Sequence, residues 1–366
     1  MNNVKLPFYA QLALTLLAIV LIIFFLVQGR TIFVPLVFAV LVGVLLYPLN
    51  KFLENKLHLG RAVASFLSVF VFITVIAGFI YFFTIQIVNF SQDIPMLQKR
   101  VGEIITSIQH WISYKYHINT RQQTDYINKS ATDIISRVYN SVSNIFLSVT
   151  GILLLIVFVF IFSFFMLYHR RLLLRFILHL FRAKHRDRVN EVISETRSMM
   201  NSYVLGLVLE MIIVGIVNCT LLLILGIKYA VFLGVLTAVM NIIPYLGIYS
   251  STVFAMLITF ANSSWGNALS VGLALIIVHI LDANVLMPRI VGGRVKMNPM
   301  ITIVAVLVGE FIWGIPGMFL FIPIVGMLKI VFERVDGMQP WAILIGADDN
   351  KPILETKKPE KTRTGD

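Results

Sequence analysis

The sequence contains few charged residues: Asp, Glu, Lys and Arg together make up 13% of its 366 residues. Typical soluble domains carry about a quarter. Hydrophobic residues make up 58%, and apolar runs of about 20 residues recur, each long enough to cross a bilayer core of about 30 Å. A transmembrane β-barrel would instead show alternating strands of about ten residues. The sequence therefore predicts an all-α, polytopic integral membrane protein with about eight membrane segments.

Cysteine is nearly absent as well. The single Cys219 lies inside an apolar run, so no disulfide framework exists and the redox compartment stays undetermined. The sequence has no Walker A phosphate loop, no Gly-x-Ser-x-Gly elbow and no His-Glu-x-x-His or Cys-x-x-Cys pattern. We expect no enzyme, no cofactor and no metal site. An aspartyl intramembrane protease needs paired aspartates, and Asp282 is the only Asp within an apolar run.

Acidic residues are outnumbered, 18 against 30 basic ones, which gives a formal charge of +12. The bases lie between the apolar runs, where they set topology, so we expect no nucleic-acid partner. Eight Lys or Arg fall in 169–201, and three in each of 51–61 and 285–300. Because such bases stay inside, we predict cytoplasmic N- and C-termini and an outward-facing segment 89–145.

The runs divide the chain into six parts. Three transmembrane helices are expected at 8–27, 31–48 and 62–87, within residues 1–88. The other parts are an extracytoplasmic helical domain (89–145), a fourth transmembrane helix (146–168), a basic and amphipathic cytoplasmic linker (169–202), a transport core (203–334) and a cytoplasmic, disordered tail (335–366).

Two of these parts have more than one interpretation. In 89–145 apolar residues return at helical spacing, which suits either a plain spacer or a gating or assembly element. The linker, 169–202, suits either a simple positive-inside anchor or a surface that binds anionic lipid in the bilayer.

After residue 203 glycine and proline become frequent. Thirteen of the 22 glycines and five prolines fall in 203–334. The apolar pieces 229–243 and 246–262 are too short to span the bilayer comfortably, and 299–313 and 317–334 are joined by a similar Pro-Gly break. Such interrupted segments point to a transporter's binding site. We predict two re-entrant hairpins, with full membrane crossings as the alternative that charge does not exclude.

The hinges of these hairpins are formed by glycine and proline. We assign this role to the following positions: Pro244, Gly247, Pro288, Gly292, Gly314, Pro316 and Gly317.

Three acidic residues lie inside apolar segments, and all three follow residue 203: Glu210, Asp282 and Glu310. Intramembrane carboxylates are costly and usually functional. Asp282 is expected either to line the pathway or to pair structurally, with Arg289 or with freed backbone N–H groups. Glu210 is expected either to snorkel to a basic loop or to line the pathway. Glu310 is expected to cap a half-helix.

Other polar groups accompany them, and together with the three carboxylates they are the candidates for the transport pathway: His279, Asn284, Arg289, Asn241 and Tyr245. His279 shares a helix face with Asp282 and can hydrogen-bond to it, whereas Asn284 points elsewhere and Arg289 follows a helix end expected at Pro288. Asn241 is expected to bond a neighbouring helix. Tyr245, at the first hairpin tip, is either a gate or an interface anchor.

The order of short motifs resembles the autoinducer-2 exporter family of bacterial permeases. The motifs that carry the resemblance are Tyr203-x-x-Gly206, Asn241-Ile242-Ile243-Pro244-Tyr245-Leu246-Gly247, His279-x-x-Asp282-x-Asn284-x-Leu286-x-Pro288-Arg289-Ile290-x-Gly292 and Gly314-Ile315-Pro316-Gly317.

This resemblance implies a multi-pass inner-membrane permease that forms homo-oligomers and exports a small polar metabolite such as autoinducer-2. Some relatives are instead assigned to sodium or lithium/proton antiport, so a monovalent cation or proton is the alternative partner. A structural scaffold is a third reading, which leaves the broken hairpins unexplained. Membership of a family does not choose between these functions.

Overall fold

The computed structural model describes residues 7–93, 149–243, 246–290 and 297–347, with a few single residues between 95 and 106. Most of the predicted outward domain and of the predicted tail therefore lies outside the described residues, as do Pro244, Tyr245 and Gly292. Within the described residues the chain is helical throughout, with one isolated bridge between Met297 and Gly346. The predicted all-α fold is confirmed.

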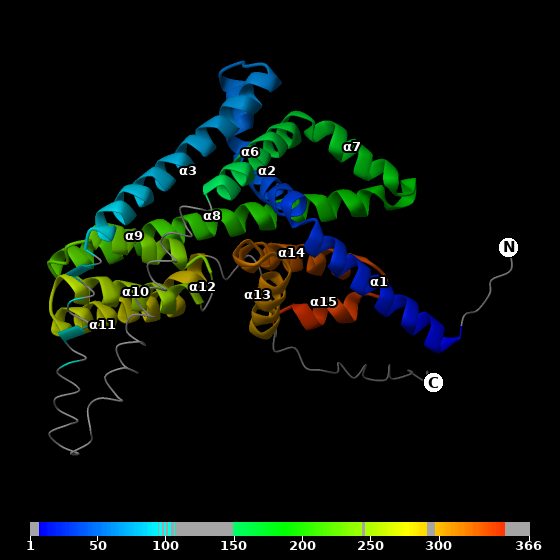
Figure 1. Ribbon diagram of the computed structural model, residues 1–366. Helices are drawn as coiled ribbons and strands as arrows, with labels where there is room; N and C mark the ends of the chain where they lie inside the picture. The colour runs from blue at the N-terminus through cyan, green and yellow to red at the C-terminus, as the bar shows by residue number, and fades with distance from the viewer. Residues whose placement is uncertain are drawn as a thin grey trace, which may run out of the picture.

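The helices follow the apolar runs closely (Figure 1). Before the long undescribed stretch they are α1 (Phe8–Gln28), α2 (Arg30–Lys56) and α3 (Arg61–Ser91). After it come α6 (Val149–Tyr168), α7 (Arg170–Leu180), a short 3-10 turn (Ala183–His185) and α8 (Arg186–Ile224). The remaining elements are α9 (Ala230–Met240), α10 (Leu246–Asn262), α11 (Trp265–Leu281), the π-helix η2 (Asp282–Leu286), α12 (Met287–Ile290), α13 (Pro299–Trp313), α14 (Ile315–Arg334) and α15 (Gln339–Ile345).

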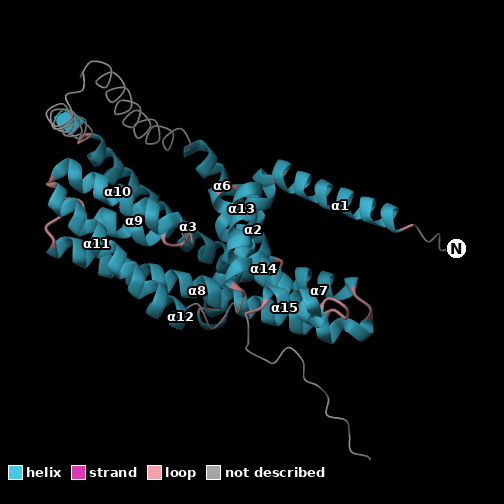
Figure 2. Cartoon of the chain, turned by 90° about the horizontal axis from the view of Figure 1, so that it is seen from below, coloured by secondary structure: helices cyan, strands magenta, loops and turns pink. Residues whose placement is uncertain are grey.

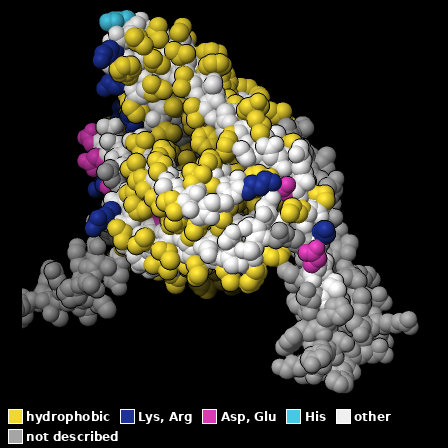
Figure 3. Space-filling view, turned by 90° about the vertical axis from the view of Figure 1, so that its left-hand side faces the viewer, with side chains coloured by type: hydrophobic (Ala, Val, Ile, Leu, Met, Phe, Trp, Pro, Cys, Tyr) yellow, Lys and Arg dark blue, Asp and Glu magenta, His cyan; other side chains and the backbone are white. Residues whose placement is uncertain are grey.

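Seven of these helical segments combine the length and the hydropathy needed to cross a bilayer. Three more apolar helices, α9, α10 and α13, are shorter. Large hydrophobic side chains cover much of the outer surface, and Figure 3 shows them across one face of the molecule. The helix α1 buries none of its side chains and extends away from the other helices in Figures 1 and 2. An apolar exterior of this kind suits a lipid surrounding.

The longest helix, α8, joins the predicted linker (169–202) to the first part of the predicted transport core (203–334). It runs for 39 residues without a break, because no proline interrupts it and its glycines are single. It ends where Leu225 is followed by Gly226, which has a φ of +68°, a backbone conformation that glycine adopts without strain. At that end α9 and α11 contact α8, and α10 packs against α9 and α11 (Figure 2).

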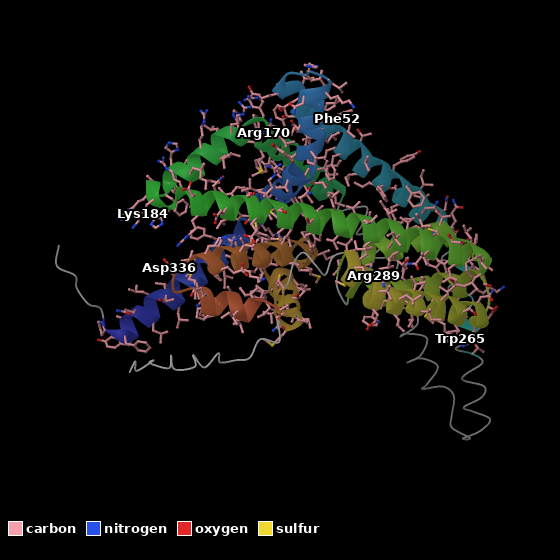
Figure 4. All side chains as sticks on the ribbon, turned by 180° about the vertical axis from the view of Figure 1, so that it is seen from behind. Phe52, Arg170, Lys184, Trp265, Arg289 and Asp336 are labelled. Carbon is pink, nitrogen blue, oxygen red and sulfur yellow. The ribbon has the colours of Figure 1, made fainter. Side chains whose placement is uncertain are left out.

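The end of α2 is tied to the start of α7 by a polar cluster. Arg170 donates to Asn50 Oδ1 at 3.0 Å and to Glu54 Oε2 at 2.5 Å, and Asn50 donates to Ser65 Oγ at 2.9 Å. Arg170 lies near Phe52 in Figure 4. The Tyr47 ring contacts Arg197 of α8 at 3.4 Å. Four helices thus meet at this cluster, in which Glu54 Oε2 is paired and Glu54 Oε1 is buried without a partner among the described residues.

The second hairpin, α13 and α14, is held together by two glycines. A Cβ atom on Gly317 would lie 1.9 Å from the carbonyl oxygen of Gly309, and one on Gly309 would lie 2.3 Å from that of Gly317. The turn between the arms is made by Gly314, with φ +66°. The first hairpin has a similar contact, because a Cβ on Gly247 would lie 1.7 Å from the Met240 carbonyl oxygen.

Candidate functional site

Glu210 projects from α8 into the interior. It lies on the buried stripe of that helix, and only 5% of the residue is exposed. The members of the stripe recur every three or four residues: Tyr203, Gly206, Glu210, Val214, Asn218 and Leu222. A carboxylate on such a stripe faces other helices rather than lipid. The expectation that Glu210 snorkels to a basic loop is therefore not met.

Asn241 caps the C-terminus of α9 and connects three elements. Its Nδ2 donates to Asp282 Oδ2 at 2.8 Å and to Glu210 Oε1 at 3.3 Å. Asn241 stands at the end of the first hairpin arm, just before the undescribed Pro244 and Tyr245. One amide therefore brings together two carboxylates that come from α8 and from the junction after α11.

Asp282 is 3% exposed and is the first residue of the π-helix η2. A proline lacks an N–H and in general disfavours the helical turn before it, so a regular α-helix is strained ahead of Pro288. The wider π turn over Asp282–Leu286 occurs just before this proline, and α12 continues through it to Ile290. The prediction that the helix ends at Pro288 was wrong. Single π turns are frequent at functional sites.

The two carboxylates have spare acceptor capacity. Glu210 Oε2 and Asp282 Oδ1 are both buried and accept no hydrogen bond from the described residues. No described Lys or Arg forms an ion pair with either carboxylate. Two like charges buried together are costly unless a proton or a cation lies between them. The arrangement can therefore hold a proton, a cation or a hydroxyl-bearing solute.

His279 lies one turn before Asp282 but does not bond to it. Its ring packs edge-on against Tyr249, with the ring centroids 6.4 Å apart, and its Nδ1 is buried without a partner among the described residues. The expected His279–Asp282 hydrogen bond is absent from this part of the chain. The π turn begins at Asp282 and changes the helical spacing after it.

Asn284 and Arg289 point outward. The Asn284 amide donates to the Ile280 carbonyl at 2.7 Å, and both side chains are exposed. Arg289 belongs to α12 and forms no ion pair with Asp282. The structural pairing of Asp282 with Arg289 is therefore not present.

Glu310 lies outside the cluster. It is exposed on α13, and α14 begins at Gly314 without a side-chain cap, so the predicted capping role of Glu310 was wrong. Pro316 occupies the first turn of α14, where its missing N–H costs nothing. Gly247 and Gly317 make the close backbone contacts described above.

Two features of the site were not predicted from the sequence. One is that Glu210 and Asp282 share an amide, although each was a candidate by itself. The other is Gly309, whose contact with Gly317 closes the second hairpin. For the shared amide, the signal available in the sequence was the position of Asn241 just before a Pro-Gly break. The described residues contain no cluster of three His, Cys, Asp or Glu suited to a metal.

Known proteins resemble this chain over most of its length. A family model described as AI-2E family transporter matches residues 14–337. "Putative transport protein YrrI" of Bacillus subtilis (strain 168) is 26% identical over 313 residues, which cover 82% of this chain and 86% of the relative. "Putative transport protein YueF" of the same organism is 26% identical over 321 residues, which cover 85% of this chain and 86% of the relative. "AI-2 transport protein TqsA" of Escherichia coli (strain K12) is 26% identical over 140 residues, covering 38% and 40%.

Proposed function

This chain belongs to the AI-2E transporter family, and we propose that it exports a small polar metabolite through a pathway centred on Glu210, Asn241 and Asp282. The observation that carries the proposal is the single amide that bonds two buried carboxylates. Buried acceptors without partners favour a ligand that brings hydrogen-bond donors. A small molecule with several hydroxyl groups supplies them.

The broken helices support a pathway at this place. Asn241 ends the short helix α9, and Asp282 opens a π turn. Both interruptions free backbone groups that only protein or a water-lined cavity can satisfy within a membrane. TqsA, a relative, is named as an AI-2 transport protein, so autoinducer-2 is the first substrate to test.

The setting of this pathway follows from charge and apolar surface. We assign the protein to the bacterial inner membrane with both termini in the cytoplasm, because the basic segments 51–61, 169–201 and 285–300 then lie on one side. Residues 89–145 face outward in this arrangement. The largely exposed apolar helices leave surface for a homo-oligomer as well as for lipid.

Antiport of Na⁺ or Li⁺ against protons is the second candidate. It is favoured by the same carboxylates, since two acidic groups without a basic partner can exchange a proton for a monovalent cation. Export of a neutral solute needs the acceptors, whereas antiport needs their ionisation. The two functions therefore respond differently to Asp282→Asn, which keeps an acceptor oxygen but cannot ionise.

The first experiment measures export by purified protein in liposomes loaded with autoinducer-2. We expect vesicles that contain the wild-type protein to release autoinducer-2 faster than loaded liposomes without protein. Asp282→Ala and Glu210→Ala should slow release about tenfold or more, because a hydrogen bond to a charged group is worth about 1.5–3 kcal/mol. Glu310→Ala is the matched control and should behave like wild type. If the wild-type protein releases autoinducer-2 no faster than loaded liposomes without protein, export of this molecule is contradicted.

The same vesicles with an internal pH-sensitive dye test antiport. If the second candidate is right, added Na⁺ or Li⁺ drives proton movement in wild type and in Glu310→Gln, and Asp282→Asn abolishes it. Absence of cation-driven proton movement in vesicles that do export autoinducer-2 contradicts antiport.

A further inference from the structure

A groove separate from the Glu210–Asp282 site lies between the linker helices and the end of α14. Its volume is about 460 Å³, within the range of about 300–1,000 Å³ that is typical of small-molecule sites. Four elements line it: α7, the 3-10 turn, the first turns of α8 and the C-terminal turn of α14 with the residues after it. In Figure 4, Lys184 and Asp336 mark this region on the same side of the molecule.

The walls and the rim of the groove differ in chemistry. The walls are aliphatic and aromatic: Ile177, Phe181, Val189, Val192, Ile193, Val331 and Val335. The rim carries His185, Arg188 and Arg334, with Asp336 as its acidic member. An elongated molecule with an apolar body and an anionic end matches this division.

The two arginines of the rim are not equally available. Arg334 forms an ion pair with Glu195 and a longer one, of 3.7 Å, with Glu333. Arg188 has weaker partners, Asp336 Oδ2 at 3.5 Å and the Arg334 carbonyl at 3.4 Å. The Asp336 side chain is 89% exposed, and exposed pairs of this kind contribute little. Arg188 can therefore exchange Asp336 for the phosphate of a ligand.

The linker segment that precedes and partly lines the groove is strongly basic. Residues 169–188 contain seven Lys or Arg and one Asp. On α7 the exposed Leu172, Phe176 and Leu180 follow one another at intervals of four, and Arg171 and Arg175 lie on the adjacent face. Because α7 begins two residues after the membrane-spanning α6 ends, this amphipathic helix lies at a membrane surface. A basic site at that level meets the anionic headgroups of lipids.

We propose that the groove between α7, α8 and the end of α14 binds one anionic phospholipid, with an acyl chain along the apolar walls and the phosphate at Arg188. The bound lipid connects the linker to α14, which is one arm of the second broken hairpin. The proposal does not depend on which solute the transporter carries.

The test is native mass spectrometry of the purified full-length protein titrated with phosphatidylglycerol or with phosphatidylcholine of the same acyl chains. We expect wild type to retain phosphatidylglycerol several-fold more tightly. Arg188→Gln should remove most of this preference, and Val189→Trp, which fills the groove without changing charge, should weaken binding of the phosphatidylglycerol. Arg171→Gln removes an equal charge outside the groove and should bind like wild type. Size-exclusion elution establishes that each variant is folded.

Three results overturn the proposal. Equal retention of the two lipids by wild type means that charge does not select the occupant. Equal losses in Arg188→Gln and Arg171→Gln mean that a diffuse basic surface attracts lipid. Unchanged binding in Val189→Trp, or complete displacement of the lipid by inorganic phosphate, means that the acyl chain does not occupy the groove.

Discussion

Asn241 donates a 2.8 Å hydrogen bond to Oδ2 of Asp282, and this bond connects the end of α9 to the π turn that follows α11. The same amide reaches Glu210 on α8 at 3.3 Å. A movement of the first hairpin therefore changes what both carboxylates bond to. This coupling between a hairpin position and two acidic groups is the structural basis of the first prediction.

Asn241→Ala should abolish transport, whereas Asn218→Ala should not. Both asparagines connect α8 with α9. Asn218 donates a 2.9 Å hydrogen bond to Thr237 Oγ1 and bonds neither carboxylate. Each loss should lower the free energy of unfolding by about 1–3 kcal/mol. Only the first removes the donor shared by Glu210 and Asp282. Thermal unfolding and vesicle release measured on both variants check this, and equal transport by the two contradicts it.

Gly317→Ala should destabilise the second hairpin. Its Cβ would meet the Gly309 carbonyl oxygen at 1.9 Å, so α13 and α14 have to separate, and overpacking of this kind costs about 1–3 kcal/mol or more. Gly78→Ala in α3 is the control, because no atom lies within 4 Å of that Cβ and alanine favours a helix by about 1 kcal/mol. The melting temperature in detergent should fall for the first and not for the second.

Asp93 should stabilise the protein in a pH-dependent way. Burial alone would raise its pKa, but hydrogen bonds from Lys228 and Tyr229, each 2.7 Å long, outweigh this, and the pKa of Asp93 lies below its usual 3.8. A lowered pKa in the folded state gives stability that is present above about pH 4 and is lost as the pH falls through the folded value. The Asp93 carboxylate also raises the pKa of Lys228. The stability that this raised pKa contributes is lost only as the pH rises through it.

The measurement compares melting temperatures of wild type and Asp93→Asn from acid to neutral pH. The difference should be steady between about pH 5 and 9 and should narrow below about pH 4, near the ordinary pKa of an Asp. Asp336→Asn removes a carboxylate that is 89% exposed and should change little at any pH. A difference that widens in acid has the opposite sign and rules out this account.

Arg170→Ala should destabilise the protein more than Arg171→Ala. Arg170 donates to Asn50 and Glu54 and lies 5.4 Å from the centre of the Tyr47 ring. Hydrogen bonds to charged groups contribute about 1.5–3 kcal/mol, whereas exposed substitutions such as Arg171→Ala usually stay within about 0.5 kcal/mol. Arg170→Lys should recover only part of the loss, since an ammonium lacks the fork that reaches both partners. Thermal unfolding of the three variants gives the order.

The sequence by itself determined the class of protein and the positions of its helices. Runs of about 20 apolar residues predict membrane helices from length alone, and α1, α3 and α6 follow the predicted 8–27, 62–87 and 146–168 closely. The helix α2 starts as predicted but continues beyond residue 48 to Lys56. The Pro-Gly breaks between α9 and α10 and between α13 and α14 were likewise visible, because these residues interrupt a helix through their own backbone chemistry. The family followed from the order of the motifs.

Only the tertiary structure decided which polar groups meet. Periodicity shows that Glu210 and Asp282 lie on helices, but their common contact with Asn241 depends on how α8, α9 and α11 pack. The same holds for the contact between Gly309 and Gly317, and for Pro288, where α12 continues after a π turn instead of ending. Local sequence sets the helix and its apolar face; the partner of a buried side chain is set by long-range packing, on which spacing along the chain carries no information.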